Sequence, residues 1–422
     1  MKARSSAAAA AAALALLLSS TGCTLNRFDQ RRVYHLAHPL AVSDEAFGRS
    51  LSAFGFALVG GNRAEIYNNG DEIFPAMIAA IGDARLSVNL ESYIFWDDNA
   101  GAPVAAALMD AARRGVEVRV LVDGTGSKFS GAMLQRMRHA GVHTAVYHRL
   151  LLKNLHKIVS RTHRKILVVD GTTSFTGGFG IGEWWLGDAR EPAEWRDIMV
   201  GATGPVSAQM QAVFSEDWTY TTGEILAGEK FYPAQQPAGG VAGQAIKVSR
   251  GDSSSRAAML YYVAIESARR SIYIQNAYFV PGRQLRDALS AAARRGVDVR
   301  LMVPGHHMDQ PLVGMTLRRH YGRLLRAGVR IFEYDRTMMH NKDAVIDGVF
   351  TTIGSINFDP RSLHENAEES LAFYDRDVGA RMEAVFADDQ RYCREITLAS
   401  WKRRGFQSRL GEVFAGFFRP FY

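Results

Sequence analysis

Apolar and polar residues follow one another in an order that predicts alternating strands and helices. Every second position from Val116 to Val122 is a valine, which is the pattern of a strand. The stretch before it has Pro103 near its start and Gly115 at its end, where these residues suit the beginning and the end of a helix. Helices that alternate with strands predict an α/β fold, with helices packed around a mixed sheet.

The same pattern occurs twice along the chain. Residues 111–119 (AARRGVEVR) recur as residues 292–300 (AARRGVDVR). An aromatic, strand-like run precedes each copy, at 88–95 and at 272–279. Two segments in the same order indicate a duplicated domain. We therefore expect two α-β-α sandwich repeats that share one active site.

The repeat and the local composition divide the chain into four parts. The stretch PAQQPAGGVAGQ is rich in Pro, Gly, Ala and Gln, which is typical of a linker. The predicted parts are a signal peptide at 1–23, a first repeat at 45–232, a linker at 233–244, and a second repeat with a C-terminal helical tail at 245–422.

The N-terminus has the pattern of an export signal. Lys2 and Arg4 precede twelve apolar residues, Ala7 to Leu18, too few to span a bilayer comfortably. Gly22-Cys23 follows small residues and resembles a bacterial lipobox, although Ser20 stands where leucine is usual. We expect an exported protein, anchored at Cys23 on the periplasmic side of a membrane. The alternative is a signal that is uncleaved or cleaved elsewhere.

Composition and charge narrow the class of protein. The chain is 47% hydrophobic and 22% charged, which suits a globular protein and not a disordered one. A net charge of +7 fits an anionic partner such as phospholipid head groups, a membrane surface or nucleic acid, but also a merely basic surface. With two cysteines, Cys23 and Cys393, neither a disulfide framework nor a cysteine metal cluster is expected.

The pattern His-x-Lys-x4-Asp occurs once in each repeat. The copies run from His163 to Asp170 and from His340 to Asp347, and a glycine follows each. Each copy predicts a strand that ends in an Asp-Gly turn. Side chains alternate along a strand, so the histidine shares a face with Lys165 or Lys342. The aspartates have the opposite parity, and we expect them to support the site without contacting substrate.

These residue types fit phosphodiester chemistry without a metal. A neutral imidazole can attack phosphorus, and a second, protonated imidazole can donate to the leaving oxygen. Two lysines can supply positive charge to the phosphoryl oxygens. Lysine is a poor ligand for the hard cations of phosphoryl transfer, so neither a metal nor another cofactor is expected. Only two facing repeats together provide all these groups.

A second signal follows each aspartate at the same spacing. Ser355 and Asn357 come after the second motif, in the run Gly-Ser-Ile-Asn, and are candidate hydrogen-bond donors to phosphate. The equivalent run in the first repeat is Gly-Gly-Phe-Gly, with Gly180 in the place of Asn357. Gly180 has no side-chain donor, so the site relies on Asn357 alone or on a backbone N–H or water in the first repeat.

These doubled motifs resemble the phospholipase D superfamily, over most of residues 60–420. Further stretches are similar to bacterial cardiolipin synthases: Tyr93-Ile94-Phe95 with Asp98 and Gly101, Trp195-Arg196-Asp197, Asp217-Trp218, and Asn357-x-Asp359-x-Arg361-Ser362 with Asn366-x-Glu368. The resemblance implies that one histidine is the nucleophile and the other the general acid.

The resemblance also suggests roles for individual residues. It favours His163 as nucleophile and His340 as acid, with the reverse assignment still open. In such enzymes a carboxylate about 30 residues after each histidine orients the imidazole, and Asp197 and Glu368 occupy those positions. Gly180 departs from the family, which usually has asparagine there.

The expected activity is a phosphatidyl transfer. One phosphatidylglycerol would give its phosphatidyl group to a second, which yields cardiolipin and glycerol. The alternatives are a hydrolase that uses water, a nuclease, and a lipid-binding protein without catalysis. The export signal favours anionic phospholipid and a membrane surface as partners, and argues against nucleic acid. The sequence leaves the oligomeric state open.

Overall fold

The computed structural model describes residues 34–38, 40–128, 130–148, 161–249 and 256–405. The predicted signal peptide and Cys23 lie outside these residues. In the part of the chain that is described, no helix is long and apolar enough to cross a membrane. Two short helices come first, α2 (Glu45–Leu51) and the 3-10 turn Ser52–Phe54.

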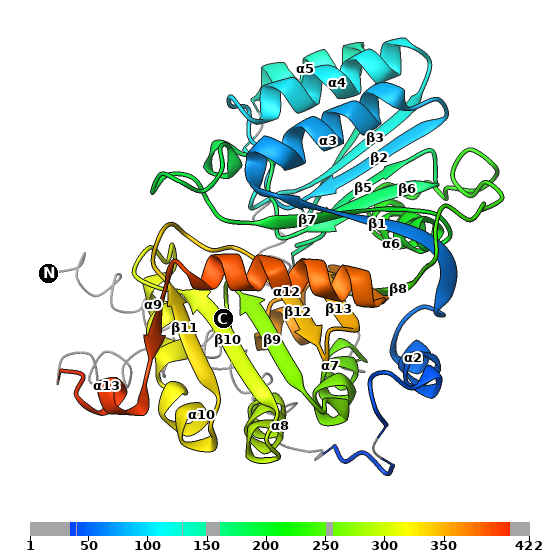
Figure 1. Ribbon diagram of the computed structural model, residues 1–422. Coiled ribbons are helices and arrows are strands. Elements are labelled where there is room, and N and C mark those ends of the chain that lie inside the picture. The colour runs from blue at the N-terminus through cyan, green and yellow to red at the C-terminus, as the bar shows by residue number, and fades with distance from the viewer. Residues whose placement is uncertain (1–33, 39, 129, 149–160, 250–255, 406–422) are drawn as a thin grey trace, which may run out of the picture.

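Among the described residues, a single mixed sheet of fifteen strands runs through both halves, with helices on its two faces (Figure 1). Its first half has the strand order β1-β7-β6-β5-β2-β3-β4. The elements are β1 (Val59–Asn68), α3 (Asn69–Asp83), β2 (Ser87–Ser92), α4 (Gly101–Arg113), β3 (Glu117–Asp123), α5 (Gly131–His139), β4 (His143–Tyr147), β5 (Lys165–Val169), β6 (Thr173–Gly177), the 3-10 turn Glu183–Trp185, β7 (Ile198–Thr203) and α6 (Val206–Thr222).

The second half repeats this order as β8-β14-β13-β12-β9-β10-β11, with β15 added at the edge. The elements are β8 (Val241–Val248), α7 (Arg256–Ser267), β9 (Ser271–Asn276), α8 (Arg283–Arg294), β10 (Asp298–Pro304), α9 (Pro311–Arg318), α10 (Tyr321–Ala327), β11 (Arg330–Tyr334), β12 (Lys342–Ile346), β13 (Phe350–Gly354), α11 (Pro360–His364), β14 (Glu368–Tyr374), α12 (Arg376–Gln390), β15 (Cys393–Ile396) and α13 (Leu398–Lys402). The predicted duplication and α/β class therefore agree with the topology.

The two halves are joined edge to edge. Strand β1 pairs antiparallel with β8, through Val59 opposite Gly243 and Asn62 opposite Val241. Strand β8 thus begins at Val241, inside the segment predicted as a linker. The Gly- and Ala-rich composition that suggested a linker belongs partly to a strand that is hydrogen-bonded on both sides, to β1 and to β14.

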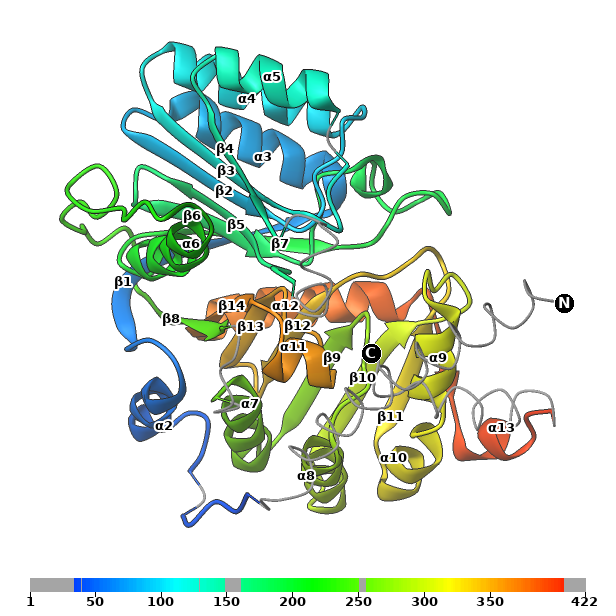
Figure 2. The ribbon, with the colours of Figure 1, turned by 180° about the vertical axis from the view of Figure 1, so that it is seen from behind.

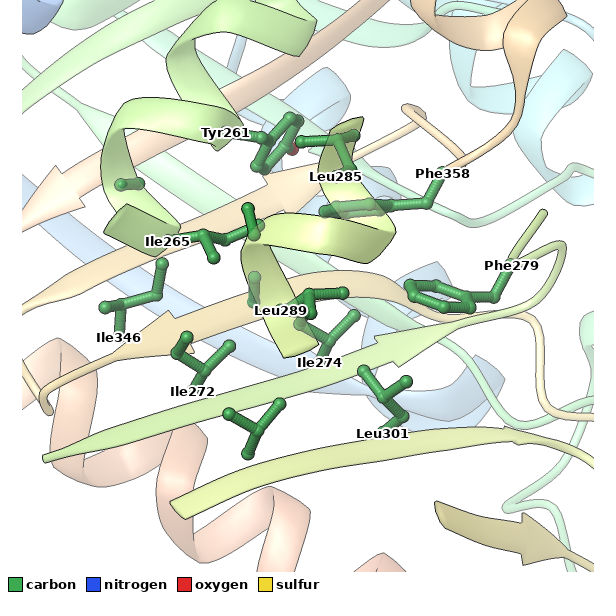
Figure 3. Close-up of a cluster of buried hydrophobic side chains, with 14 of the residues drawn as sticks. Tyr261, Ile265, Ile272, Ile274, Phe279, Leu285, Leu289, Leu301, Ile346 and Phe358 are labelled. Carbon is green, nitrogen blue, oxygen red and sulfur yellow. The ribbon is translucent and has the colours of Figure 1, made fainter. Parts of the chain in front are cut away.

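The outer helices form one core in each half. In the first half, α3 and α4 pack on the sheet around Ile73, Val104, Leu108 and Val118. In the second half, α7 and α8 lay Ile265 and Leu289 over residues of β9, β10 and β12 (Figure 3). Of the valines predicted to form a strand, Val118, Val120 and Val122 lie in β3, which begins one residue after Val116, so the strand is confirmed.

The inner helices α6 and α12 lie between the halves (Figure 2). Their side chains share a third core. It contains Phe214 of α6 and Met382 of α12, together with Val168 of β5 and Val345 of β12. Neighbouring side chains of β5 point into the outer core instead, so this strand is buried on both faces. This packing brings the beginnings of β5 and β12 to the junction of the two halves.

Candidate active site

The two motif histidines lie just before the central strands of their halves. The strands begin at Lys165 and Lys342, so the prediction that the histidines belong to these strands is wrong by two residues. The reason is local pairing with the other half. Thr162 forms an isolated parallel bridge with Ala367, and Arg196 forms one with Met339.

A backbone hydrogen bond to the opposite half holds each motif histidine in place. The His163 N–H donates to the carbonyl of Ala367 over 2.9 Å, and the His340 N–H donates to the carbonyl of Arg196 over 2.7 Å. Each histidine is therefore held against the residue that comes immediately before a carboxylate of the opposite half. These carboxylates are Glu368 and Asp197.

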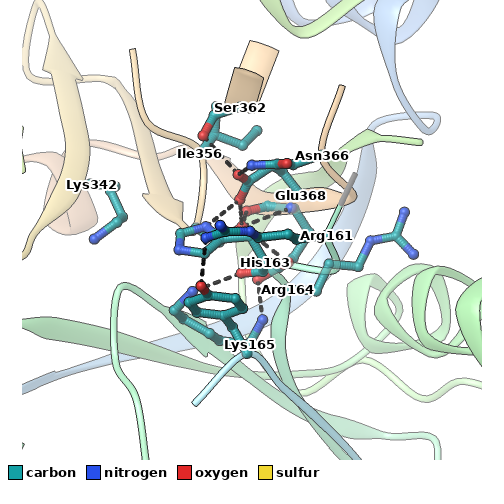
Figure 4. A network of polar contacts seen from close by, with 12 residues as sticks. Arg161, His163, Arg164, Lys165, Lys342, Ile356, Ser362, Asn366 and Glu368 are labelled. Carbon is teal, nitrogen blue, oxygen red and sulfur yellow. Dashed lines mark hydrogen bonds and ion pairs between the residues drawn. The ribbon is translucent and has the colours of Figure 1, made fainter. Parts of the chain in front are cut away.

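Each imidazole pairs with a carboxylate through its Nδ1 atom. His163 Nδ1 lies 2.9 Å from Glu368 Oε2, and His340 Nδ1 lies 2.9 Å from Asp197 Oδ2. Figure 4 shows the first of these pairs. The residues expected to orient the histidines do contact them, but each serves the histidine of the other half. The pairing within each half that the spacing suggested is thus wrong. A carboxylate at Nδ1 leaves Nε2 free for chemistry.

The two carboxylates are held by different neighbours. Ser355 Oγ donates to Glu368 over 2.5 Å and Ser362 Oγ over 2.7 Å. Asp197 accepts from Trp185 Nε1 over 2.8 Å and from the backbone N–H of Ile198 over 2.8 Å. Ser355 stays a predicted phosphate ligand. In this structure its hydroxyl lies 2.5 Å from Glu368 Oε2 and 3.2 Å from both the carbonyl oxygen and Oε2 of Glu369, so it also positions Glu368.

Burial and charge separate the two pairs electrostatically. Burial raises the pKa of Glu368 to about 7, against the favourable charge of Lys165. The pKa of Asp197 is instead lowered, because hydrogen bonding and charge from His340 outweigh the opposing effect of burial. At neutral pH, Asp197 is therefore ionised, whereas Glu368 is close to half protonated.

The pKa values of both imidazoles are lowered. Burial, followed by the charges of Lys165 and Lys342, holds the pKa of His163 well below its usual value. Burial and the charge of Lys342 lower the pKa of His340 to about 4, although the contact with Asp197 raises it. Each histidine responds to the lysines of both halves, which indicates one shared site.

The motif lysines lie beside their own histidines. Lys165 Nζ donates to the carbonyl of His163 over 2.7 Å, and Lys342 Nζ donates to the carbonyl of His340. Burial lowers the pKa of Lys342 to about 7, with Asp197 opposing the shift. The site thus offers two imidazoles of lowered pKa among buried lysines, which suits an anionic phosphodiester.

The motif aspartates lie at the turns, away from the imidazoles. Asp170 and Asp347 have positive φ values of 51° and 54°, and a glycine follows each in the hairpin. Asp170 accepts backbone N–H bonds from residues 85–87, and Asp347 accepts them from residues 269–271. They tie the hairpins to the starts of β2 and β9, in agreement with the expected supporting position.

The glycine that departs from the family pattern has a steric reason. A Cβ atom at Gly180 would lie 2.8 Å from the Trp185 ring and 3.2 Å from Ile94 Cβ. The indole that holds Asp197 therefore occupies the space of a side chain at 180. In the second half, Asn357 is buried and its Oδ1 has no hydrogen-bond partner. It stays a predicted phosphate ligand.

The buried Arg196 holds the backbone of Asp197 in position, a role that the sequence did not predict. Arg196 Nε bonds both oxygens of Asp389, at 2.8 and 3.0 Å, and Nη1 donates to the carbonyl of Asp197 over 2.8 Å. The run Trp195-Arg196-Asp197 is part of the family resemblance, but the resemblance suggested no role for Arg196. Trp185 gave no comparable signal, because its contact with Asp197 depends on the fold.

The comparisons with known proteins agree with this geometry. Residues 77–218 and 261–390 match the family described as cardiolipin synthase, PLD-like domain. The chain is 34% identical to a probable cardiolipin synthase, YwiE, of Bacillus subtilis, over 84% of this chain and 71% of that protein. It is also 34% identical to a cardiolipin synthase of Geobacillus kaustophilus, over 85% of this chain and 72% of that protein.

One solved structure supports the fold alone. The phosphatidylserine synthase of Haemophilus influenzae superimposes with a TM-score of 0.66 at 14% identity, over 89% of this chain and 96% of that one. The family match covers more than half of the chain and both histidine motifs. The chain therefore belongs to the cardiolipin synthase family of phospholipase D-like proteins.

Proposed function

We propose that the protein is a cardiolipin synthase that transfers a phosphatidyl group from one phosphatidylglycerol to another through a phosphohistidine. The single observation that carries the proposal is the crossed pair of histidine–carboxylate contacts. It presents two Nε2 atoms with unequal surroundings to one cationic site. Independent support comes from the similar proteins, a probable cardiolipin synthase and a cardiolipin synthase that each match most of this chain.

In the first step, His163 Nε2 attacks the phosphorus of phosphatidylglycerol, and the bond to glycerol oxygen breaks. The depressed pKa of His163 keeps this nitrogen unprotonated. His340 gives a proton to the leaving alkoxide, and the ionised Asp197 stabilises the imidazolium form of His340 that can do so. Lys165 and Lys342 offset the charge that develops on the phosphoryl oxygens.

In the second step, a hydroxyl of another phosphatidylglycerol attacks the phosphohistidine. His340 takes the proton, His163 is released, and cardiolipin leaves. Water in place of the lipid hydroxyl would give phosphatidic acid. The acceptor therefore decides between the transferase and its alternative, a hydrolase.

The test is the incubation of purified full-length protein with vesicles of phosphatidylglycerol, followed by mass spectrometry of the lipids. We expect cardiolipin and glycerol in equal amounts, and none from a His163→Ala variant. Phosphatidic acid as the main product would show a hydrolase instead. No lipid turnover at all would favour a binding protein without catalysis.

We further propose that the protein works at the periplasmic side of a membrane, anchored by lipid at Cys23. The apolar run before Cys23 and the lipid substrate support this location. Cys23→Ser should move the protein from the membrane fraction to the soluble periplasmic fraction. An unchanged distribution would refute lipidation at this residue.

A further inference from the structure

Cardiolipin synthesis from two phosphatidylglycerols places two phosphates at the enzyme during the second step. One is bound to histidine, and the other belongs to the acceptor lipid. A hydrolase has only the first. If the proposed function holds, the protein therefore needs a cationic group near His163 that is separate from the motif lysines.

Arg161 has the properties of such a group. Its Nη1 donates to the Tyr93 hydroxyl over 2.7 Å, and its guanidinium lies 5.8 Å from the centre of the Tyr93 ring. Its Nε is buried and has no hydrogen-bond partner. Within the described part of the chain, no carboxylate forms an ion pair with it. A guanidinium has five N–H donors, so among the described residues most of the Arg161 donors have no partner.

Tyr93 links Arg161 to the reaction centre. The Tyr93 ring meets the His163 imidazole edge to face, with 5.0 Å between centroids. Figure 4 shows the Arg161 side chain alongside His163. The charge of Arg161 contributes to the lowered pKa of His163, after burial and the two motif lysines. Arg161 is thus close to the phosphorus position but contacts neither motif lysine.

Arg161 can bind an anion with the donors that these contacts leave over. Its guanidinium forms charge-assisted hydrogen bonds to a phosphate, which are stronger than hydrogen bonds between neutral groups.

We propose that Arg161 binds the phosphate of the acceptor phosphatidylglycerol. The lipid is then held with its free glycerol hydroxyl at the phosphohistidine. A phosphorus–oxygen bond forms to that hydroxyl, the bond from phosphorus to His163 Nε2 breaks, and the proton goes to His340. Free glycerol has no phosphate and reacts at the same phosphorus without this contact.

The two acceptors give a direct test. Phosphatidylglycerol vesicles are incubated with isotope-labelled glycerol, and two products are measured: cardiolipin, and phosphatidylglycerol that has gained the label. For Arg161→Gln we expect cardiolipin formation to fall at least about tenfold, while label exchange stays within about twofold of the wild type. Arg138→Gln, which removes one exposed charge from α5, is the matched control and should change neither.

Equal falls in both products would overturn the inference, because Arg161 would then serve the donor lipid or the fold. Unchanged cardiolipin formation would overturn it as well. If Arg161→Gln does not fold, Arg161→Lys carries the test, with a loss of about threefold expected in cardiolipin alone. A wild-type protein that makes only phosphatidic acid would instead refute the proposed function, and the acceptor site with it.

Discussion

The two halves repeat one fold but surround their histidines with opposite charges. In the first half, Tyr93 packs on His163 and its hydroxyl accepts a hydrogen bond from a cation, Arg161. In the second half, the Tyr278 ring lies 5.9 Å from the His340 ring, and its hydroxyl donates to the anion Asp309 over 2.8 and 2.9 Å. Duplication thus supplies the geometry twice, and the neighbouring side chains make the two copies unequal.

The carboxylates extend this contrast. The proton-binding Glu368 faces His163, and the ionised Asp197 faces His340. A neutral imidazole suits attack on phosphorus, and an imidazole beside a permanent negative charge suits proton donation. The motif alone assigns neither role, because it is the same in both halves. Its surroundings support the assignment made here.

The histidines provide the largest expected contrast. His163→Ala should abolish transfer, at least about a thousandfold, for every substrate, since the covalent step is lost. His340→Ala should slow phosphatidylglycerol turnover roughly 100- to 10,000-fold. The same variant should stay within about tenfold of wild type on a phosphatidyl ester of p-nitrophenol, which leaves without a proton. The opposite pattern would exchange the two roles.

The crossed carboxylates come next. Asp197→Asn should reduce turnover by roughly a hundredfold, because the imidazolium of His340 loses its counter-charge. Combined with His340→Ala, it should add little, since both changes remove one function. Glu368→Gln should cost less, because an amide resembles the protonated acid. If the effect of Asp197→Asn were additive with His340→Ala and absent with His163→Ala, the crossing would lose its functional meaning.

Stability should separate the same two residues by pH. The folded-state pKa of Glu368 is about 7, above its ordinary 4.5, so its contribution is complete below pH 4.5 and is lost as the pH rises to about 7. Glu368→Gln should therefore melt higher, relative to wild type, at pH 8 than at pH 5.

The sign reverses for Asp197. Its folded-state pKa is lowered below 3.8, so its contribution is present above that pH and is lost on further acidification. Asp197→Asn should melt below the wild type at both pH 5 and pH 8. Thermal melting of the two variants checks both signs, and parallel curves would contradict the electrostatic contrast.

The smallest effect on chemistry is expected at the turn aspartates. Asp170→Ala and Asp347→Ala each remove acceptors from three backbone N–H groups and strain a residue at positive φ. Unfolding free energy should fall by about 1–3 kcal/mol in each, as measured by denaturant titration. Turnover per folded molecule should remain near wild type. A large loss of turnover at full stability would place these carboxylates in the chemistry.

The fold could be predicted from the sequence because the signals for it are either local or repeated. The valine alternation in β3 and the Asp-Gly turns concern residues near in the chain, and the recurrence of 111–119 at 292–300 is a repeat that can be read directly from the sequence. The carboxylates themselves were identified by the resemblance. Their exchange was not, because it depends on backbone bridges between residues about 150 to 200 positions apart.

Other contacts escaped prediction for the same reason. The sequence does not show which groups the Ser355 hydroxyl contacts, because only the fold places Glu368 beside it. Gly180 looked like a missing ligand, but the fold puts the Trp185 indole in that space. Arg161 lies only two residues before His163 in the sequence. Its significance depends on Tyr93, 68 positions earlier in the chain.

Because each histidine pairs with a carboxylate of the other half, activity requires that both halves are present and packed together. A nascent chain that ends after the first half has His163 without Glu368, and an isolated second half has His340 without Asp197. Either fragment is chemically unfinished, and mixing the two should restore turnover only as they associate. The reactive centre therefore forms only when both halves of the chain have been made and have packed against each other.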